Sequence, residues 1–423
     1  MKLSKLITRL IKSPSPIREI MKMADPVNIK AMGLNPEDVI SFAGGWVAHN
    51  PPPELKEIYL EIIEDPELWY RTGGYSATPG DTDVRASLAR LEEELSGVKN
   101  ISYKNVIVGQ SSTQLIYSLF QTLLDPEDSI LFLDPTYPNY FTQYFFSIGF
   151  IKESGILRVP FLDPIEWSLR LEGAKQKILD LLGSGAVKIF VLPSPDNPTS
   201  QVFPDSFLRE VLEEALNHDI WVIIDYAYKY LNFGVSPDYY SYSPTDYPNL
   251  IALHSNSKWM RNLGRRMGWV IANEKVIEGL ERAQQAHILC PDSLHQAAIS
   301  KFIDKTLDNG TLKRFISETK VRYRELAELT VKSLEKHLHF PYIEPMGGIY
   351  LVCKVGMDSD LFVRKVFRST GVLFVPGKGF GSTLSEGIRI SYGPLINTPE
   401  KVEEGFERVE RFIEEEGLSE KQD

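Results

Sequence analysis

Short apolar runs, several of them β-branched, recur through the middle of the chain, and longer amphipathic stretches separate them. Runs of this length and composition suit strands that are buried on both faces of a parallel sheet and joined by helices. The alternation therefore predicts an α/β fold with a doubly wound, mostly parallel sheet. The predicted strands are residues 106–108, 130–133, 188–192, 220–224 and 250–253, with helices at 113–124 and 207–217.

The C-terminal quarter of the chain follows a different pattern. It predicts a long helix over residues 314–337, strands at 350–355 and 372–375, and a closing helix capped by Thr398 with Pro399 in its first turn. These elements indicate a smaller α+β domain built from both chain ends.

We expect three regions along the chain. Residues 1–65 form an N-terminal arm and part of the small domain, residues 66–315 form the large domain, and residues 316–423 complete the small domain.

The composition narrows the classes of function. The 423 residues carry 46 basic and 57 acidic side chains, a net charge of −11 with neutral histidines. Such a chain repels phosphate backbones and anionic membranes, so neither nucleic acid nor a membrane is an expected partner. Only two cysteines are present, Cys290 and Cys353, which cannot build a disulfide framework. We therefore expect a reducing, cytoplasmic location.

Targeting and metal signals are weak. The apolar residues of segment 1–11 have helical spacing but are interrupted by Lys5 and Arg9, which predicts an amphipathic surface helix and not a signal peptide. No apolar run approaches the ~18 residues of a membrane span. The seven histidines show no metal-ligand spacing, so no metal site is expected.

Each predicted strand is followed directly by a polar cluster. Ligands of open parallel sheets bind beyond the carboxyl ends of the strands, so these clusters are where a site is expected. They are residues 109–113, 134–138, 193–199, 225–228 and 254–258.

Taken singly, each cluster also has a simpler interpretation. Residues 111–113 are suited to cap the following helix, although free amides at a helix N-terminus also bind phosphate. Asn197 with Pro198 suits a turn. Asp225 ends an apolar run and so needs a partner, which a structural ion pair would also supply. A lone lysine such as Lys258 is usually solvated.

The clusters taken together resemble the pyridoxal-phosphate-dependent aminotransferases of fold type I, class I/II. The resemblance runs from about Ser15 to Tyr392, and the number and order of the motifs carry it. The main motifs are Tyr75-x4-Gly80, Asn197-Pro198-Thr199, Asp225-x-x-Tyr228, Ser255-x-Ser257-Lys258, Arg266 and Arg389.

The resemblance implies a role for each of these residues. Lys258 would form the Schiff base with pyridoxal 5'-phosphate and then move the substrate proton. Asp225 would pair with the pyridine nitrogen, which keeps the ring an electron sink. Asn197 and Tyr228 would bind the phenolate oxygen of the ring, and Tyr137 would stack on its face.

The phosphate and the substrate have their own implied residues. Backbone amides of residues 111–113 (Ser111, Ser112 and Thr113), with Ser255 and Arg266, would hold the phosphate. Tyr75 would reach it from a neighbouring subunit, which implies a homodimer with shared active sites. Arg389, with Asn197, would bind the α-carboxylate of the substrate in two-pronged geometry, near the backbone of Gly45.

Two positions depart from the family pattern. Ser200 replaces the usual glycine after Asn-Pro-Thr, and Ser111-Ser112-Thr113 replaces the usual Gly-Ser-Gln. Ser111 must then accept whatever backbone angle the glycine provided.

Two motifs near the N-terminus bear on the choice of amino-acid substrate. The motifs around residues 15–20 and 41–45 look like the branch of 2-aminoadipate, kynurenine and aromatic aminotransferases, in which Arg18 would approach the substrate side chain. Pairing of Arg18 with a carboxylate of its own helix is an equal alternative. Trp46 and Tyr70 are expected either in an apolar substrate pocket or in the core.

We predict an enzyme that moves the amino group of an L-amino acid to a 2-oxo acid, with 2-oxoglutarate as the expected acceptor. A lyase or decarboxylase on the same fold is the alternative, because the carbanion that the cofactor stabilises can react further in several ways. A non-catalytic sensor is less well supported, since Lys258, Asp225 and Arg389 are all retained.

Overall fold

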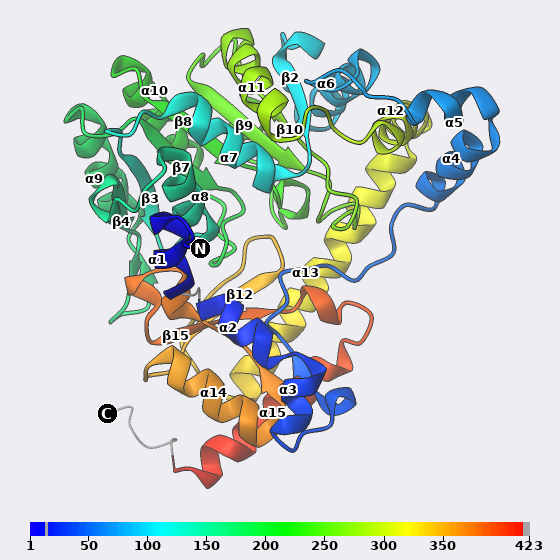
Figure 1. The fold of residues 1–423 in the computed structure, drawn as a ribbon. Coiled ribbons are helices and arrows are strands. Elements are labelled where there is room, and N and C mark those ends of the chain that lie inside the picture. The colour runs from blue at the N-terminus through cyan, green and yellow to red at the C-terminus, as the bar shows by residue number, and fades with distance from the viewer. Residues whose placement is uncertain (13–15, 418–423) are drawn as a thin grey trace.

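A seven-stranded sheet forms the centre of the larger part of the protein, in the order β2-β10-β9-β8-β7-β3-β4 (Figure 1). The computed structural model describes residues 1–12 and 16–417; Ser15, where the family resemblance begins, and the last residues of region 316–423 lie outside them. The strands are β2 (Val106–Gly109), β3 (Ile130–Asp134), β4 (Ile156–Pro160), β7 (Ile189–Pro193), β8 (Trp221–Asp225), β9 (Leu250–Ser255) and β10 (Gly268–Ile271).

The predicted doubly wound, mostly parallel sheet is confirmed. Strands β9, β8, β7, β3 and β4 pair in parallel, whereas β10 runs antiparallel to both of its neighbours. The apolar runs did not predict strands β4 and β10. Strand β4 lies at the sheet edge and contains the polar Arg158, and β10 spans four residues after an arginine-rich loop, so neither forms a long apolar run.

Helices cover both faces of this sheet, because alternate strand residues point to opposite faces. On one face, Ile107 belongs to a hydrophobic cluster with residues of helices α7, α8 and α11. On the other face, Val106 and Val108 belong to a second hydrophobic cluster with residues of α4, α6, α9, α10 and α12. The helices are α4 (Pro53–Glu64), α6 (Thr82–Ser96), α7 (Ser112–Leu123), α8 (Asn139–Ile148), α9 (Leu171–Gly183), α10 (Asp205–Asn217), α11 (Glu274–His287) and α12 (Ser293–Asp308).

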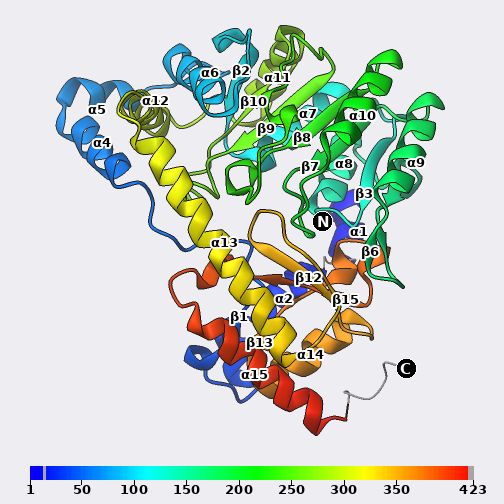
Figure 2. The same cartoon turned by 180° about the vertical axis from the view of Figure 1, so that it is seen from behind.

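The smaller part contains an antiparallel sheet in the order β11-β12-β15-β14, with helices packed on it (Figure 2). The strands are β11 (Tyr342–Ile343), β12 (Tyr350–Lys354), β14 (Val375–Pro376) and β15 (Gly387–Ser391), and the helices are α13 (Thr311–His337), α14 (Ser359–Thr370) and α15 (Glu400–Glu415).

Both chain ends contribute to this smaller part. Strand β1 (Ile40–Ser41) pairs in parallel with β13 (Val372–Leu373), and the ring of Phe42 stacks 5.3 Å from the rings of both Phe374 and Phe406. The assembly of the smaller part from both ends agrees with the expected organisation, although the exact region boundaries stay predictions.

Two sequence expectations for this part need correction. The expected strand over 372–375 is two strands, because β13 pairs with β1 and β14 pairs with β15 on either side of Phe374. The closing helix begins at Glu400 with Pro399 as its N-cap residue, so the prediction that Thr398 caps it is wrong.

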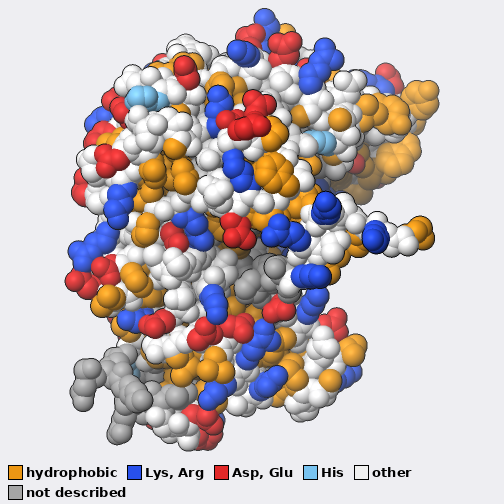
Figure 3. Space-filling view, turned by 60° about the vertical axis from the view of Figure 1, so that its left-hand side comes forward, with side chains coloured by type: hydrophobic (Ala, Val, Ile, Leu, Met, Phe, Trp, Pro, Cys, Tyr) orange, Lys and Arg blue, Asp and Glu red, His pale blue; other side chains and the backbone are white. Residues whose placement is uncertain are grey.

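The N-terminal segment contains short helices: α1 (Lys5–Lys12), α2 (Pro16–Met23), α3 (Pro26–Ala31) and, further on, α5 (Pro66–Thr72). Helix α1 confirms the predicted amphipathic surface helix, since none of its residues is buried. Within residues 1–12 and 16–417, no helix has the length and apolar character needed to cross a membrane. Acidic and basic side chains are interspersed over the face drawn in Figure 3.

Two glycines in helices give opposite predictions for stability. A Cβ at Gly405 in α15 would lie 2.7 Å from a ring carbon of Phe42, whereas one at Gly173 in α9 would meet no atom within 4 Å. Gly405→Ala should therefore lower the free energy of unfolding by about 1–3 kcal/mol through overpacking. Gly173→Ala should raise it by about 0.5–1 kcal/mol through helix propensity. Urea unfolding measures both; equal effects would contradict the packing of α15 on Phe42.

Candidate active site

A cavity of about 340 Å³ lies where the carboxyl ends of the large-sheet strands face the smaller part. It is lined by side chains from the ends of β8 and β9, from the start of α7 and from β15. It brings together Gly45, Ser111, Ser112, Thr113, Tyr137, Asn197, Asp225, Tyr228, Ser255, Lys258, Arg266 and Arg389. Residues more than 300 positions apart in sequence thus meet at one place.

Asp225, the last residue of β8, is buried at this cavity. Its Oδ2 atom accepts a hydrogen bond of 2.8 Å from the hydroxyl of Tyr140, and its Oδ1 atom accepts one of 3.0 Å from the backbone N–H of Ala227. Burial raises the pKa of this carboxyl, while the bond from Tyr140 acts against the rise. A cationic partner in the cavity would therefore stabilise the ionised form.

Lys258 follows β9 and is partly buried. Its ammonium group donates a hydrogen bond to the carbonyl oxygen of Gly45 and lies 5.6 Å from the centre of the Tyr228 ring. Burial lowers the pKa of this lysine to about 8, and the positive charges of Arg389 and Arg266 act in the same direction. An amine with such a pKa is partly unprotonated near neutral pH, as a general base requires.

Arg389, on β15 of the small sheet, is held from several sides. Its NH1 group donates a 2.9 Å hydrogen bond to the Oδ1 atom of Asn197, and NH2 donates a 3.3 Å bond to the carbonyl of Ala43. The guanidinium carbon lies 4.1 Å from the ring centre of Tyr350 and 4.8 Å from that of Phe380. Its buried Nε atom has no partner among residues 1–12 and 16–417, so one donor remains to be satisfied.

Two tyrosines stand out that the sequence reading assigned no role. The hydroxyl of Tyr350 lies 2.6 Å from that of Tyr228, and Tyr140 donates to Asp225 as described above. Tyr140 also packs edge-on against Tyr137, with ring centres 5.3 Å apart. The contacts of Tyr350 depend on the approach of the two sheets, which no local pattern in the sequence indicates.

The start of α7 has the features of an anion site. Ser111 precedes the helix with φ of 98°, and its side chain makes no capping hydrogen bond within the part of the chain that the structure describes. Simple capping by Ser111 is therefore not seen. A Cβ at Gly268 would lie 2.7 Å from the backbone nitrogen of Ser112, so only glycine lets β10 approach this turn so closely.

The two serines that replace family glycines both adopt left-handed backbone angles. Ser111 has φ of 98° and Ser200 has φ of 58°. The structure thus keeps the loop geometry that glycine favours, at some cost in strain.

Ser255 and Arg266 complete the lining beside residues 111–113. The hydroxyl of Ser255 donates to the Ser257 hydroxyl at 2.9 Å, and Arg266 donates to the carbonyl of Leu263 at 2.7 Å. With the free end of α7 they form a cluster of donors suited to a phosphate.

These residues fit pyridoxal 5'-phosphate at both ends of the cavity. The buried carboxyl of Asp225 suits a protonated ring nitrogen, and the donors at the α7 start suit a phosphate. The amine of Lys258 lines the same cavity.

Of the aromatic residues that the sequence singled out, Tyr75 and Tyr70 lie outside the cavity and Trp46 lies in its lining. Tyr75 is 88% exposed and does not line this cavity, and Tyr70 is likewise exposed on α5. Trp46 lines the cavity, so the core alternative for it is wrong.

Arg18 lies in a neighbouring cavity of about 670 Å³ that shares Met21 and Trp46 with the first. The carboxylate next to it, Glu19, pairs with Arg364, and Arg18 forms no ion pair among the described residues.

One group of possible metal ligands occurs elsewhere, at the contact of α13 and α15. Ligand atoms of His337, Glu403 and Glu407 lie within 4.8 Å of one another. Lys336 already pairs with Glu403, and His337 contacts Glu410 at 2.7 Å. The expectation that the protein uses no metal stays a prediction.

Known proteins resemble the whole chain. The family model for aminotransferases of class I and II matches residues 43–409. An aromatic-amino-acid aminotransferase of Thermococcus litoralis is 24% identical over 412 residues, covering 96% of this chain and 97% of its own. An aspartate aminotransferase of Bacillus subtilis is 26% identical over 433 residues, covering 98% and 99%.

Solved structures share the fold. An aspartate aminotransferase of Thermotoga maritima superposes with a TM-score of 0.80 at 22% identity, over 97% of this chain and 100% of that one.

The environment of Lys258 predicts its reactivity. In the protein without cofactor, competitive acetylation of Lys258 should rise with pH around a midpoint of about 8, compared with about 10.4 for an unperturbed lysine. Arg389→Gln removes a positive charge and should raise that midpoint. Mass spectrometry of the Lys258 peptide measures the acetylated fraction, and a midpoint near 10 would contradict the described environment.

Proposed function

Because this chain belongs to the class I and II aminotransferase family, we propose that it moves the amino group of an L-amino acid to a 2-oxo acid with pyridoxal 5'-phosphate as cofactor, and that 2-oxoglutarate is the acceptor. The observation that carries this proposal is the meeting of Asp225, Lys258 and Arg389 in one cavity. A carboxylate, an amine of lowered pKa and a guanidinium are the three groups that the reaction needs.

Asp225 would hold the ring nitrogen of the cofactor, and Asn197 and Tyr228 its phenolate oxygen, with Tyr137 against the ring. The backbone amides of residues 111–113 would hold the phosphate together with Ser255 and Arg266. Bound pyridoxal phosphate supplies an electron sink for the electrons left when a proton leaves the substrate Cα. The buried setting of Asp225 supports this role, since a buried carboxylate requires a partner.

Lys258 would hold the cofactor through its aldehyde group and act as the general base. Its Nζ atom would take the proton from the substrate Cα once the substrate amine is bound. The pKa of about 8 supports this role, because a base near the working pH is efficient.

Arg389 would bind the α-carboxylate of the substrate. Asn197 holds one edge of the guanidinium at 2.9 Å, and the Tyr350 and Phe380 rings hold its plane. The unpartnered Nε atom supports binding of a further acceptor. Gly45, whose carbonyl oxygen accepts a hydrogen bond from Lys258, lines the same cavity.

The donor we propose is an aromatic or 2-aminoadipate-like amino acid. Met21, Trp46 and Tyr137 give the cavity an apolar wall that suits a large side chain. Arg18, beyond Met21 and Trp46, would approach an acidic side chain.

We further propose a homodimer with shared active sites, in which Tyr75 contributes to the phosphate site of the partner. Helices α4 and α5 and the segment after them carry exposed apolar side chains: Leu60, Ile63, Trp69, Tyr70 and Tyr75. Exposed apolar surface of this kind supports an interface. Sedimentation of the protein as a monomer at micromolar concentration would contradict it. We also propose a cytoplasmic location, which the presence of only two cysteines supports.

A half-reaction screen tests the function. Addition of single amino acids to the cofactor-loaded protein should convert the bound cofactor to its amine form and release a 2-oxo acid, as absorbance and product analysis measure. A lyase or decarboxylase, the second candidate, would return the cofactor to its aldehyde form, and that result would replace the proposal.

Lys258→Ala should abolish multiple turnover while leaving the fold intact, because the base that moves the Cα proton is lost. Steady-state kinetics measures the effect, with Lys177→Ala, an exposed residue of helix α9, as a matched control. Activity of the Lys258 variant at the control level would exclude the proposed role.

Arg389→Lys should weaken binding of the substrate carboxylate by about 1.5–3 kcal/mol, the range for hydrogen bonds to charged groups. The ammonium group of lysine cannot form the bidentate pair of hydrogen bonds that a guanidinium forms with a carboxylate. Titration of the half-reaction with increasing amino acid measures the change. Arg364→Lys, at an ion pair with Asp360 and Glu19 outside the cavity, serves as control and should bind normally.

A further inference from the structure

A second group of buried charges lies outside the candidate active site. Glu92 of α6 is fully buried, and its carboxylate accepts hydrogen bonds from Lys229 and from the hydroxyl of Tyr230, both at 2.9 Å. It also accepts a 3.2 Å bond from Ser96, and its Oε1 atom lies 3.2 Å from the Nδ1 atom of His254. One carboxylate therefore joins α6 to the segment that follows β8 and to the last residues of β9.

The partners of Glu92 are direct neighbours of candidate site residues. Lys229 follows Tyr228, and His254 precedes Ser255 on β9. Tyr228 and Ser255 line the active-site cavity, whereas Glu92, Lys229 and His254 do not. His254 and Ser255 are successive residues of β9 and so point to opposite faces of the sheet, which places the Glu92 contact on the face opposite to Ser255. In the turn after β8, Lys229 binds Glu92 while its neighbour Tyr228 lines the cavity.

The cluster contains one compensated charge pair. Burial lowers the pKa of His254 to about 4, so this imidazole is neutral at neutral pH. Burial also lowers the pKa of Lys229, against the attraction of Glu92. The rings of Tyr226 and Tyr240 lie 4.7 and 5.3 Å from the ammonium and add to its stabilisation. Loss of either charge would leave the other buried and unpaired.

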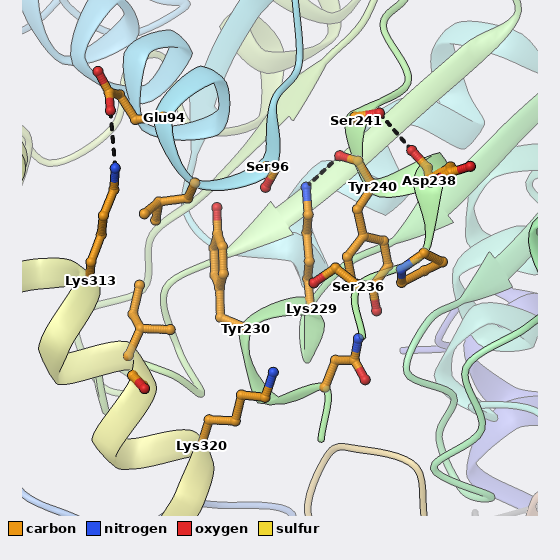
Figure 4. A pocket seen from close by; sticks show the side chains of 15 residues that line it. Glu94, Ser96, Lys229, Tyr230, Ser236, Asp238, Tyr240, Ser241, Lys313 and Lys320 are labelled. Atoms are coloured by element: carbon orange, nitrogen blue, oxygen red, sulfur yellow. Dashed lines mark hydrogen bonds and ion pairs between the residues drawn. The ribbon is translucent and has the colours of Figure 1, made fainter. Parts of the chain in front are cut away.

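The outer side of the cluster borders a cavity of about 610 Å³ (Figure 4). Lys229 donates a bond to the carbonyl of Tyr240 in this cavity, and Lys313 pairs with Glu94 across it. Tyr230 and Ser96, which also line it, bind Glu92. These groups are already satisfied by one another, so the cluster is better explained by its effect on the neighbouring segments than by a ligand in this cavity.

We infer that Glu92 is a positioning residue for the aminotransferase site: by binding Lys229 and contacting His254, it holds the Tyr228 hydroxyl and the Ser255 hydroxyl where the cofactor needs them. The inference rests on the proposed function, since Tyr228 and Ser255 act there on the cofactor's phenolate oxygen and phosphate. Glu92 itself touches neither cofactor nor substrate.

Glu92→Gln in the purified full-length protein tests this role through two properties of the bound cofactor. The affinity of the variant protein for pyridoxal phosphate should fall about tenfold. This is the lower end of the loss in affinity seen when a residue that orients a metal ligand is removed. The pH at which the absorbance spectrum of the bound cofactor changes should rise by roughly half to one unit, as expected for one weakened hydrogen bond. Equilibrium dialysis and spectrophotometric titration measure the two.

Controls separate positioning from stability. Glu410→Gln removes the charge of a carboxylate that contacts buried His337 at 2.7 Å, outside the cavity lining; it should lower the melting temperature and change neither cofactor property. If Glu92→Gln does not fold, Glu92→Gln with Lys229→Met, which buries no unpaired charge, takes its place with the same expected shifts.

The outcomes distinguish this inference from the proposed function. Wild-type affinity and wild-type titration in the folded Glu92 variant would overturn the positioning role alone. If the wild-type protein itself neither binds pyridoxal phosphate nor converts amino acids, the proposed function fails first.

Discussion

A 2.9 Å hydrogen bond from the guanidinium of Arg389 to the side-chain oxygen of Asn197 joins the two halves of the protein. Arg389 belongs to the small sheet, and Asn197 lies in the loop after β7 of the large sheet. The bond is buried, and the guanidinium also packs on Tyr350 and Phe380. The cavity between the sheets therefore has two walls. The small sheet contributes the charge of Arg389, and the strand ends of the large sheet contribute the charges of Asp225 and Lys258.

The charged groups of the two walls shift one another's pKa values. Burial raises the pKa of Asp225 and lowers that of Lys258, while Arg389 and Arg266 further favour the neutral amine. A partly neutral lysine beside a carboxylate and two guanidiniums suits a base that acts on an anionic substrate. On the outer side, Glu92 and Lys229 form a separate neutral pair, so the positive charge of the cavity is not offset from behind.

The sequence predicted the parts of the site that follow apolar strands. Asp225 and Ser255 end strands, and Lys258 and Asn197 come shortly after strands, so the strand pattern placed them at one edge of the sheet. The family resemblance then singled them out within their clusters. Ser111 was expected to adopt an unusual backbone angle, and its φ of 98° confirms this.

Residues whose roles depend on three-dimensional contacts were not found. Tyr140 matters because its hydroxyl reaches Asp225 from a helix, and Tyr350 because the small sheet brings it to Tyr228. Glu92 was missed for the same reason, since an acidic residue in an amphipathic helix usually faces solvent. The exposed Tyr75 stays a prediction, because its expected contact is with a second subunit.

The most direct test of the proposed active site is the identity of the lysine that binds the cofactor covalently. The protein loaded with pyridoxal phosphate is reduced with borohydride, digested and analysed by mass spectrometry. We expect the pyridoxyl group on Lys258 and on no other lysine. A label on another lysine such as Lys229, or no label at all, would contradict the assignment of the site.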